Sequence, residues 1–78
     1  MEITRVLGGG ILITNTDDTA FTVERVVANG SPENGNCNNY DRVTLAPGRS
    51  HTVVFLLCGT VSRLEVRTNR GTGSFTFG

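Results

Sequence analysis

The sequence predicts an all-β fold, either a small antiparallel β-sandwich of about seven short strands or a small barrel. Three observations lead to this prediction. Short apolar or alternating segments recur along the 78 residues, turn-forming residues separate them, and apolar residues do not recur at helical spacing over the length of a helix. We expect residues 1–78 to form a single domain, whose hydrophobic core alone provides only marginal stability.

The segment at residues 45–58 carries the clearest strand signal. It opens with a β-turn pattern, because Pro47 presets φ at the first corner and Gly48 tolerates a positive φ at the second. Six apolar residues follow at positions 53–58, and Gly59 closes the run. A run this short between turns predicts a central strand that is covered on both faces.

The other strands follow from local alternation and from the turns between them. In chain order we expect them at residues 2–6, 11–14, 21–28, 40–45, 61–68 and 74–77. The alternation of the third strand breaks at residues 25–27, which is the phase slip that a β-bulge produces. In segment 61–68, Leu64 and Val66 are expected to face inward, and in the last strand Phe75 and Phe77 share one face.

One turn carries a resemblance to known folds. Leu45-Ala46-Pro47-Gly48, followed by a β-branched strand, resembles the corresponding turn of bacterial immunoglobulin-like and fibronectin-like sandwiches. The resemblance is confined to this turn and the strand after it. It implies an immunoglobulin-like sandwich and says nothing about the role of the domain.

Two cysteines, Cys37 and Cys58, are candidates for a disulfide that ties a long polar loop to the end of the 53–58 run. Closing a segment of about 22 residues would stabilise the fold by roughly 3 kcal/mol, which is a large share for so small a domain. Two free thiols and an intermolecular bridge through Cys37 are the alternatives. The single His51 has no paired ligand spacing with these cysteines, so no zinc site is expected.

Motifs for catalysis or cofactor binding are absent from the sequence. The glycines at residues 8–10 permit a positive φ or a close backbone approach, but a phosphate loop would need spaced glycines, a Lys and a following helix. Ser50 and His51 are neighbours on an expected strand, where consecutive side chains point to opposite faces, so a catalytic triad is not supported. We therefore expect no enzyme and no cofactor.

The polar loop at residues 29–39 is a first candidate interface. Its candidate contact residues are Asn34, Asn36, Asn38 and Asn39. Oxygen-bearing side chains alternate through residues 33–41 and would suit a weakly bound Ca²⁺, but the spacing does not match the twelve-residue calcium loop. A plain polar loop is the favoured interpretation. The glycosylation pattern Asn29-Gly30-Ser31 is interpreted as a chance match.

A second candidate interface is the outward row Arg63, Glu65 and Arg67, together with Arg70 in the turn that follows. Charges that alternate along one face protect a sheet edge from pairing, which is the plain interpretation. Alternatively, the row is a docking face, because Arg is enriched at interfaces and pairs with carboxylates through two parallel hydrogen bonds.

Composition narrows the class of partner. Seven acidic residues balance seven arginines, the chain has no Lys, and the formal net charge is zero. Such a chain has no overall field to attract nucleic acid or an anionic membrane surface, and no segment approaches the length of a membrane span. We therefore expect protein partners, with no nucleic acid and no membrane.

Two functional hypotheses follow. The first is a small decoration or cement subunit of a phage capsid or tail, a structural virion protein that forms homo-oligomers or binds a lattice of other subunits. The second is an immunoglobulin-like binding module from the periplasm or the exterior of a bacterium. A complete 78-residue gene would favour the first, and a fragment of a signal-bearing protein the second.

Overall fold

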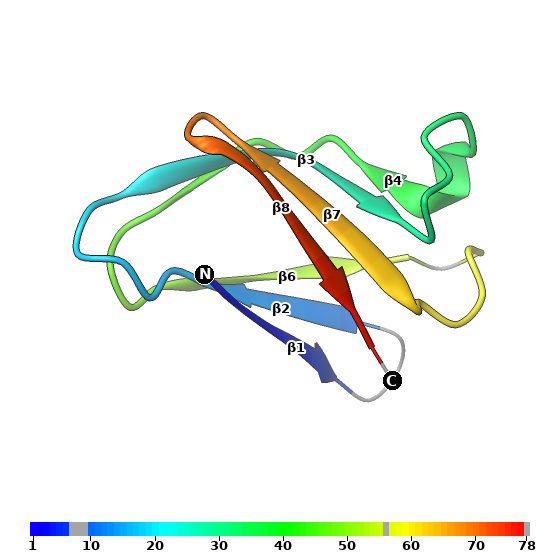
Figure 1. Cartoon of the computed structure of the whole chain (residues 1–78), viewed down its shortest axis with the longest axis horizontal. Coiled ribbons are helices and arrows are strands. Elements are labelled where there is room, and N and C mark those ends of the chain that lie inside the picture. Colours follow the sequence, from blue (N-terminus) through cyan, green and yellow to red (C-terminus); the bar gives the residue numbers. More distant parts are fainter. Residues whose placement is uncertain (7–9, 56, 78) are drawn as a thin grey trace.

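The structure is a computed structural model and describes residues 1–6, 10–55 and 57–77. The chain forms an all-β fold of two antiparallel sheets (Figure 1). Sheet A has the order β1-β2-β6, from β1 (Glu2–Val6), β2 (Gly10–Thr14) and β6 (Ser50–Val54). Sheet B has the order β4-β3-β7-β8, from β4 (Asn38–Asn39), β3 (Phe21–Ala28), β7 (Arg63–Thr68) and β8 (Gly71–Thr76). β5 (Val43–Leu45) pairs with β3, and a short 3₁₀ helix, η1 (Gly35–Cys37), precedes β4.

The two sheets enclose one hydrophobic core, to which every second residue of the inner strands contributes. Ile11 and Ile13 of β2 pair with Val53 and His51 of β6, and these rows face sheet B. The core residues of sheet B that are 0% exposed are Val23, Val26, Ala28 and Val66. Alternating burial of this kind is what places one face of each strand in the core and the other outside.

Several predicted strands are confirmed. β3 has the predicted bounds, and its register with β7 shifts between Val23 and Arg25, at the predicted β-bulge. Leu64 and Val66 are buried, as their alternation indicated. Phe75 and Phe77 are half-buried and pack against the core from the same side. Of the three glycines, only Gly10 lies within the described residues, and it begins β2.

The predicted central strand at residues 53–58 is wrong. β6 ends at Val54, lies at an edge of sheet A, and leaves Val54 48% exposed. Beyond it the chain crosses to β7, and Leu57 in this crossing segment is 77% exposed. An apolar run predicts a strand buried on both faces only when it stays within one strand, and here the run is divided between an edge strand and a crossover. Leu56 lies outside the described residues.

The predicted strand at residues 40–45 is shorter than expected. Only Val43–Leu45 pairs with β3, whereas Tyr40 and Arg42 are exposed outside the strand. The polar loop before it is more ordered than a plain loop, because it contains both η1 and β4. Similarly, β7 begins at Arg63, two residues after the predicted start, and β8 begins earlier, at Gly71.

Asn15 is a completely buried polar residue whose hydrogen bonds connect the two sheets at one end. Its side-chain Nδ2 donates to the carbonyls of Thr19 at 3.0 Å and Leu45 at 2.8 Å, while its Oδ1 accepts from the Asp17 amide at 2.8 Å. Its backbone carbonyl also accepts from Gly48, at the positive-φ corner of the predicted Pro47-Gly48 turn. The side chain of Asn15 thereby joins the β2–β3 loop to the end of β5, and its backbone carbonyl adds the turn before β6.

Candidate protein-binding surfaces

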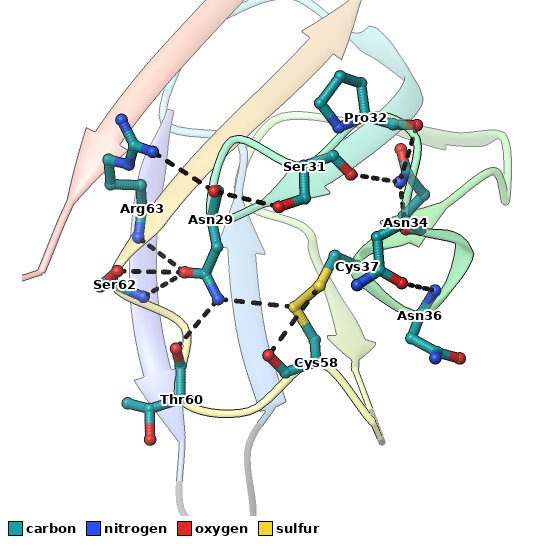
Figure 2. The surroundings of a disulfide bond; sticks show 11 residues. Asn29, Ser31, Pro32, Asn34, Asn36, Cys37, Cys58, Thr60, Ser62 and Arg63 are labelled. Carbon is teal, nitrogen blue, oxygen red and sulfur yellow. Dashed lines mark hydrogen bonds between the residues drawn. A yellow bond between two sulfur atoms is a disulfide. The ribbon is translucent and has the colours of Figure 1, made fainter.

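The predicted disulfide between Cys37 and Cys58 is present within one chain (Figure 2). Cys37 is buried at the end of η1, and Cys58 is half-buried in the segment that crosses from β6 to β7. The bond therefore connects the polar loop beside sheet B to the crossover that leaves sheet A. Because both cysteines of the sequence are used, an intermolecular bridge through Cys37 is not formed in this structure.

Asn29, in the turn after β3, forms hydrogen bonds to the same crossover between β6 and β7 (Figure 2). Asn29 and Gly30 have φ of 57° and 63°, and the Ser31 amide donates to the Ala28 carbonyl, as in a type I′ turn. The Asn29 Oδ1 accepts from the Ser62 amide at 2.8 Å, and its Nδ2 donates to the Thr60 carbonyl at 3.1 Å. The nitrogen that a glycan would modify is thus already a donor inside the fold, and a glycan would displace that bond.

Asn29 supplies both the turn conformation and the side-chain bonds, and two substitutions separate these contributions. Asn29→Gly keeps the positive φ and loses the bonds, whereas Asn29→Ala loses the bonds and also strains the backbone. We expect Asn29→Gly to lower the free energy of unfolding by about 1 kcal/mol and Asn29→Ala by about 2 kcal/mol. Urea denaturation of the two variants beside the wild type measures this order. Equal losses would show that the left-handed conformation contributes nothing.

The Asn residues predicted to form an interface mostly hold the loop itself together. Asn34 Oδ1 accepts from the Asn36 amide at 3.0 Å at the start of η1, and Asn39 Oδ1 accepts from the Asp41 amide at 3.0 Å. Asn38 Nδ2 donates to the Asn34 carbonyl, and its Oδ1 accepts from the Arg25 guanidinium at 2.6 Å. These side chains are therefore only partly available to a partner.

The same bonds weaken the calcium interpretation of this loop. The oxygens of Asn34, Asn38 and Asn39 already accept N–H donors, and a cation near Asn38 would meet the positive Arg25 guanidinium. In the part of the chain that the structure describes, no three His, Cys, Asp or Glu side chains lie together in an arrangement that could hold a metal ion.

The predicted row Arg63, Glu65 and Arg67 lies on the outer face of β7, beside Thr76, Ser74 and Thr72 of β8. Arg67 Nε pairs with Glu65 Oε1 at 2.5 Å, and Arg63 Nη2 donates weakly to the Asn29 carbonyl at 3.4 Å. The interpretation as edge protection is wrong, because β7 lies between β3 and β8 and is not an edge strand. Arg70 is exposed in the turn after β7, at the end away from Arg63.

Sequence reasoning missed a different surface, the outer face of sheet A. Cross-strand register places nine residues on it: Glu2, Thr4 and Val6 of β1, Gly10, Leu12 and Thr14 of β2, and Ser50, Thr52 and Val54 of β6. Glu2 is the only charged residue among them. Val6 is 38% exposed and Val54 48% exposed, and the more exposed Leu57 follows shortly after β6.

Gly10 allows these residues to lie close together. A Cβ at this position would approach Val6 Cγ2 to 2.7 Å, which is closer than real Cβ contacts, so only Gly lets the Val6 side chain lie over β2. Apart from Glu2 and Gly10, the residues of the three strands that face away from the core are hydroxyl or aliphatic, where a solvated sheet face usually carries charges. This composition is the signal by which the surface could have been found once the strands were paired.

Ser50 and His51 lie on opposite faces of β6, as predicted. Ser50 is exposed on the outer face, where its Oγ bonds Thr14 Oγ1 at 2.8 Å. His51 is opposite Ile13 on the inner face and is half-buried, and its Nε2 has no hydrogen-bond partner among the described residues. Sequence neighbours on a strand therefore do not form a nucleophile–base pair here.

Comparison with protein-family models, with curated proteins and with solved structures returns no match to this chain. Among the described residues no helix is long and apolar enough to cross a bilayer.

Proposed function

We propose that this chain is a non-enzymatic structural protein, a small decoration or cement subunit of a phage capsid or tail that stabilises the particle through protein contacts. The observation that carries the proposal is the outer face of sheet A, with one charge among nine residues and two exposed valines. The centres of protein interfaces are depleted of charged residues in the same way.

Exposed aliphatic side chains on this face and just after β6 favour burial against another protein. Removing the exposed parts of Val6, Val54 and Leu57 from water would contribute on the order of 1 kcal/mol each. The hydroxyls of Thr4 and Thr52 add hydrogen-bonding groups to the face without the desolvation cost of a buried charge. A flat sheet face with this chemistry suits a broad contact with another protein better than it suits a small ligand.

The disulfide supports a location outside a reducing cytosol. Disulfides persist on virion surfaces, in the periplasm and outside the cell. The Cys37–Cys58 bond is therefore compatible with an external subunit of a virion and equally with the second hypothesis.

We further propose that the sandwich is immunoglobulin-like, in the arrangement of fibronectin-type domains. Sheet A pairs the first, second and sixth strands, and sheet B places the third and seventh strands side by side with the eighth at the edge. This order matches a sandwich in which one sheet holds strands A, B and E and the other holds C, F and G with a short additional strand beside C.

A periplasmic or extracellular binding module is the second candidate. The observation that favours it is the disulfide-anchored loop beside sheet B, which leaves Asn36 and Tyr40 exposed. Tyr40 also stacks against the Arg25 guanidinium, 4.9 Å from the ring centroid. Loops fixed at one end of a sandwich are the usual binding elements of immunoglobulin-like domains.

Val54→Asp tests whether the outer face of sheet A binds the particle. An unpaired carboxylate on the sheet A face would be buried in any contact made there, so we expect at least about a hundredfold weaker association with particles. The measurement is sedimentation of the purified chain with particles from the source organism that lack it. Thr60→Asp, at an exposed position in the crossover, is the control and should bind like the wild type.

The location of the native protein separates the two candidates. In the particle proposal an antibody against the chain detects it in purified particles, and particles without it break at a lower temperature. Recovery of the chain only from periplasmic or culture fluid, with no binding to particles, would contradict the proposal and favour the module.

A further inference from the structure

The edge strands of the two sheets differ in how they are protected against pairing. Exposed edges are normally blunted by shortness, charges, Pro or a bulge. β4 and β5 have only two and three residues, and β1 carries Glu2 and Arg5. Arg5 also reaches the crossover segment before β7, where its Nη1 donates to the Val61 carbonyl at 3.0 Å. β8 has none of these devices.

β8 is a six-residue edge strand with no charged residue and no Pro, and its register with β7 runs without a bulge from Gly71 to Thr76 (Figure 1). β6 is also uncharged, but it has five residues and lies against β5 of the other sheet. β8 is therefore the longest unprotected edge among the described residues.

The hydrogen bonds of β7 define which β8 groups are free. The Phe77 amide donates to the Ser62 carbonyl at 2.9 Å, so Phe75 and Gly73 occupy the equivalent bonded positions opposite Leu64 and Val66. The N–H and C=O groups of Thr72, Ser74 and Thr76 consequently point away from β7. No bond from them to another described strand is present. These three residues form a ready template for one more antiparallel strand.

We propose that a second copy of this chain supplies that strand, with the two β8 strands paired antiparallel about a twofold axis at Ser74. The pairing rests on the proposed function as a protein-binding subunit. One of its protein partners is then another copy of the chain, and the β8 edge is the site that binds it. The register is self-complementary, because Thr72 lies opposite Thr76 of the other copy, Ser74 opposite Ser74, and Gly73 opposite Phe75.

Each cross-strand pair in this register is favourable. The free groups of Thr72, Ser74 and Thr76 meet the same groups of the other copy at hydrogen-bonded positions, and hydroxyl side chains face one another on the outer surface. The Phe75 ring already lies over Gly73 within the chain, since a Cβ at Gly73 would approach its Cε2 to 3.0 Å. A second aromatic ring opposite each Gly would cover the strand where it lacks side chains.

The charges of the two copies do not oppose the pairing. The row Arg63, Glu65 and Arg67 lies one strand in from the edge in each copy. Like charges of the two copies would be three strand spacings apart, about 14 Å, which exceeds the screening length at physiological salt. The pairing therefore joins two copies of sheet B into one continuous sheet without a repulsive contact.

Charge swaps at Ser74 test this pairing in the purified, oxidised chain without particles. Ser74→Lys and Ser74→Glu each place two like charges directly opposite one another, and each should weaken dimerisation by at least about tenfold. An equimolar mixture of the two variants should restore the dimer, because the introduced Lys of one copy then faces the introduced Glu of the other. Sedimentation velocity measures all three samples beside the wild type.

Thr44→Lys and Thr44→Glu are the matched controls and should leave the dimer intact, because Thr44 is exposed on β5, at the edge of sheet B opposite β8. A wild-type chain that stays monomeric, dimers that survive both Ser74 substitutions, or dissociation by the Thr44 charges would overturn the inference. A monomeric chain that still binds particles would contradict the edge pairing alone. A dimer that binds no particles would contradict the proposed function alone.

Discussion

Replacing Cys37 and Cys58 together by Ser is expected to lower the free energy of unfolding by about 3 kcal/mol. The bond closes a segment with a sequence separation of 21 residues, so its loss frees the unfolded chain from a substantial constraint. It also releases the crossover that Asn29 holds from the other side (Figure 2). In a domain of 78 residues a loss of this size brings the fold close to its stability limit.

Urea denaturation of the double variant, and of the wild type with and without reductant, measures this loss. Reduced wild type and double variant should unfold at the same lower midpoint, and reductant should leave the double variant unchanged. An unchanged midpoint on reduction would show that the bond does not stabilise the fold.

Asn15→Ala is expected to lower the free energy of unfolding by about 3 kcal/mol. The loss is similar to that expected for removal of the disulfide, but its mechanism is different. The substitution removes the side chain that donates to the Thr19 and Leu45 carbonyls and accepts from Asp17, in a position that is 0% exposed. The Leu45 carbonyl would lose its buried donor and gain no water in return. Thermal unfolding of the variant should show a clearly lowered Tm.

Asn69→Ala is the matched control for Asn15→Ala. Asn69 Oδ1 also accepts from a distant backbone amide, that of Thr22 in β3 at 2.9 Å, but the site is exposed and water can replace the bond. We expect Asn69→Ala to lower the free energy of unfolding by less than about 1 kcal/mol. Comparable losses at the two positions would contradict the claim that burial makes Asn15 important.

The sequence predicted what local alternation determines. The bounds of β3 and its bulge follow from the order of apolar and polar residues along one strand, and the inward positions of Leu64 and Val66 follow in the same way. The disulfide was predictable for a different reason, because a small domain with two cysteines gains more from joining them than from burying free thiols.

Features that depend on strand pairing were not predictable in this way. The run at residues 53–58 has the composition of a central strand, and only the pairing of β6 with β2 alone makes Val54 an edge residue with an exposed side chain. The outer face of sheet A is assembled from three segments whose individual patterns are unremarkable. No single segment contains enough of it to be recognised.

The structural roles of Asn15 and Asn29 were hidden for a related reason. Asn in a turn has a local explanation, because its side chain bonds the backbone nearby. The important bonds are long-range: Asn15 donates to Leu45, 30 residues away, and Asn29 accepts from Ser62, 33 residues away. Such partners are visible only once the sheets are packed together.

The most direct test of the structural-subunit proposal is the area that each copy buries against other chains in its native assembly, measured from the structure of that assembly. We expect a total well above about 1,000 Å², with the sheet A outer face and Val54 at the centre of the contact. Small, wet contacts that leave Val54 exposed would contradict it, and would make the chain an autonomous binding domain.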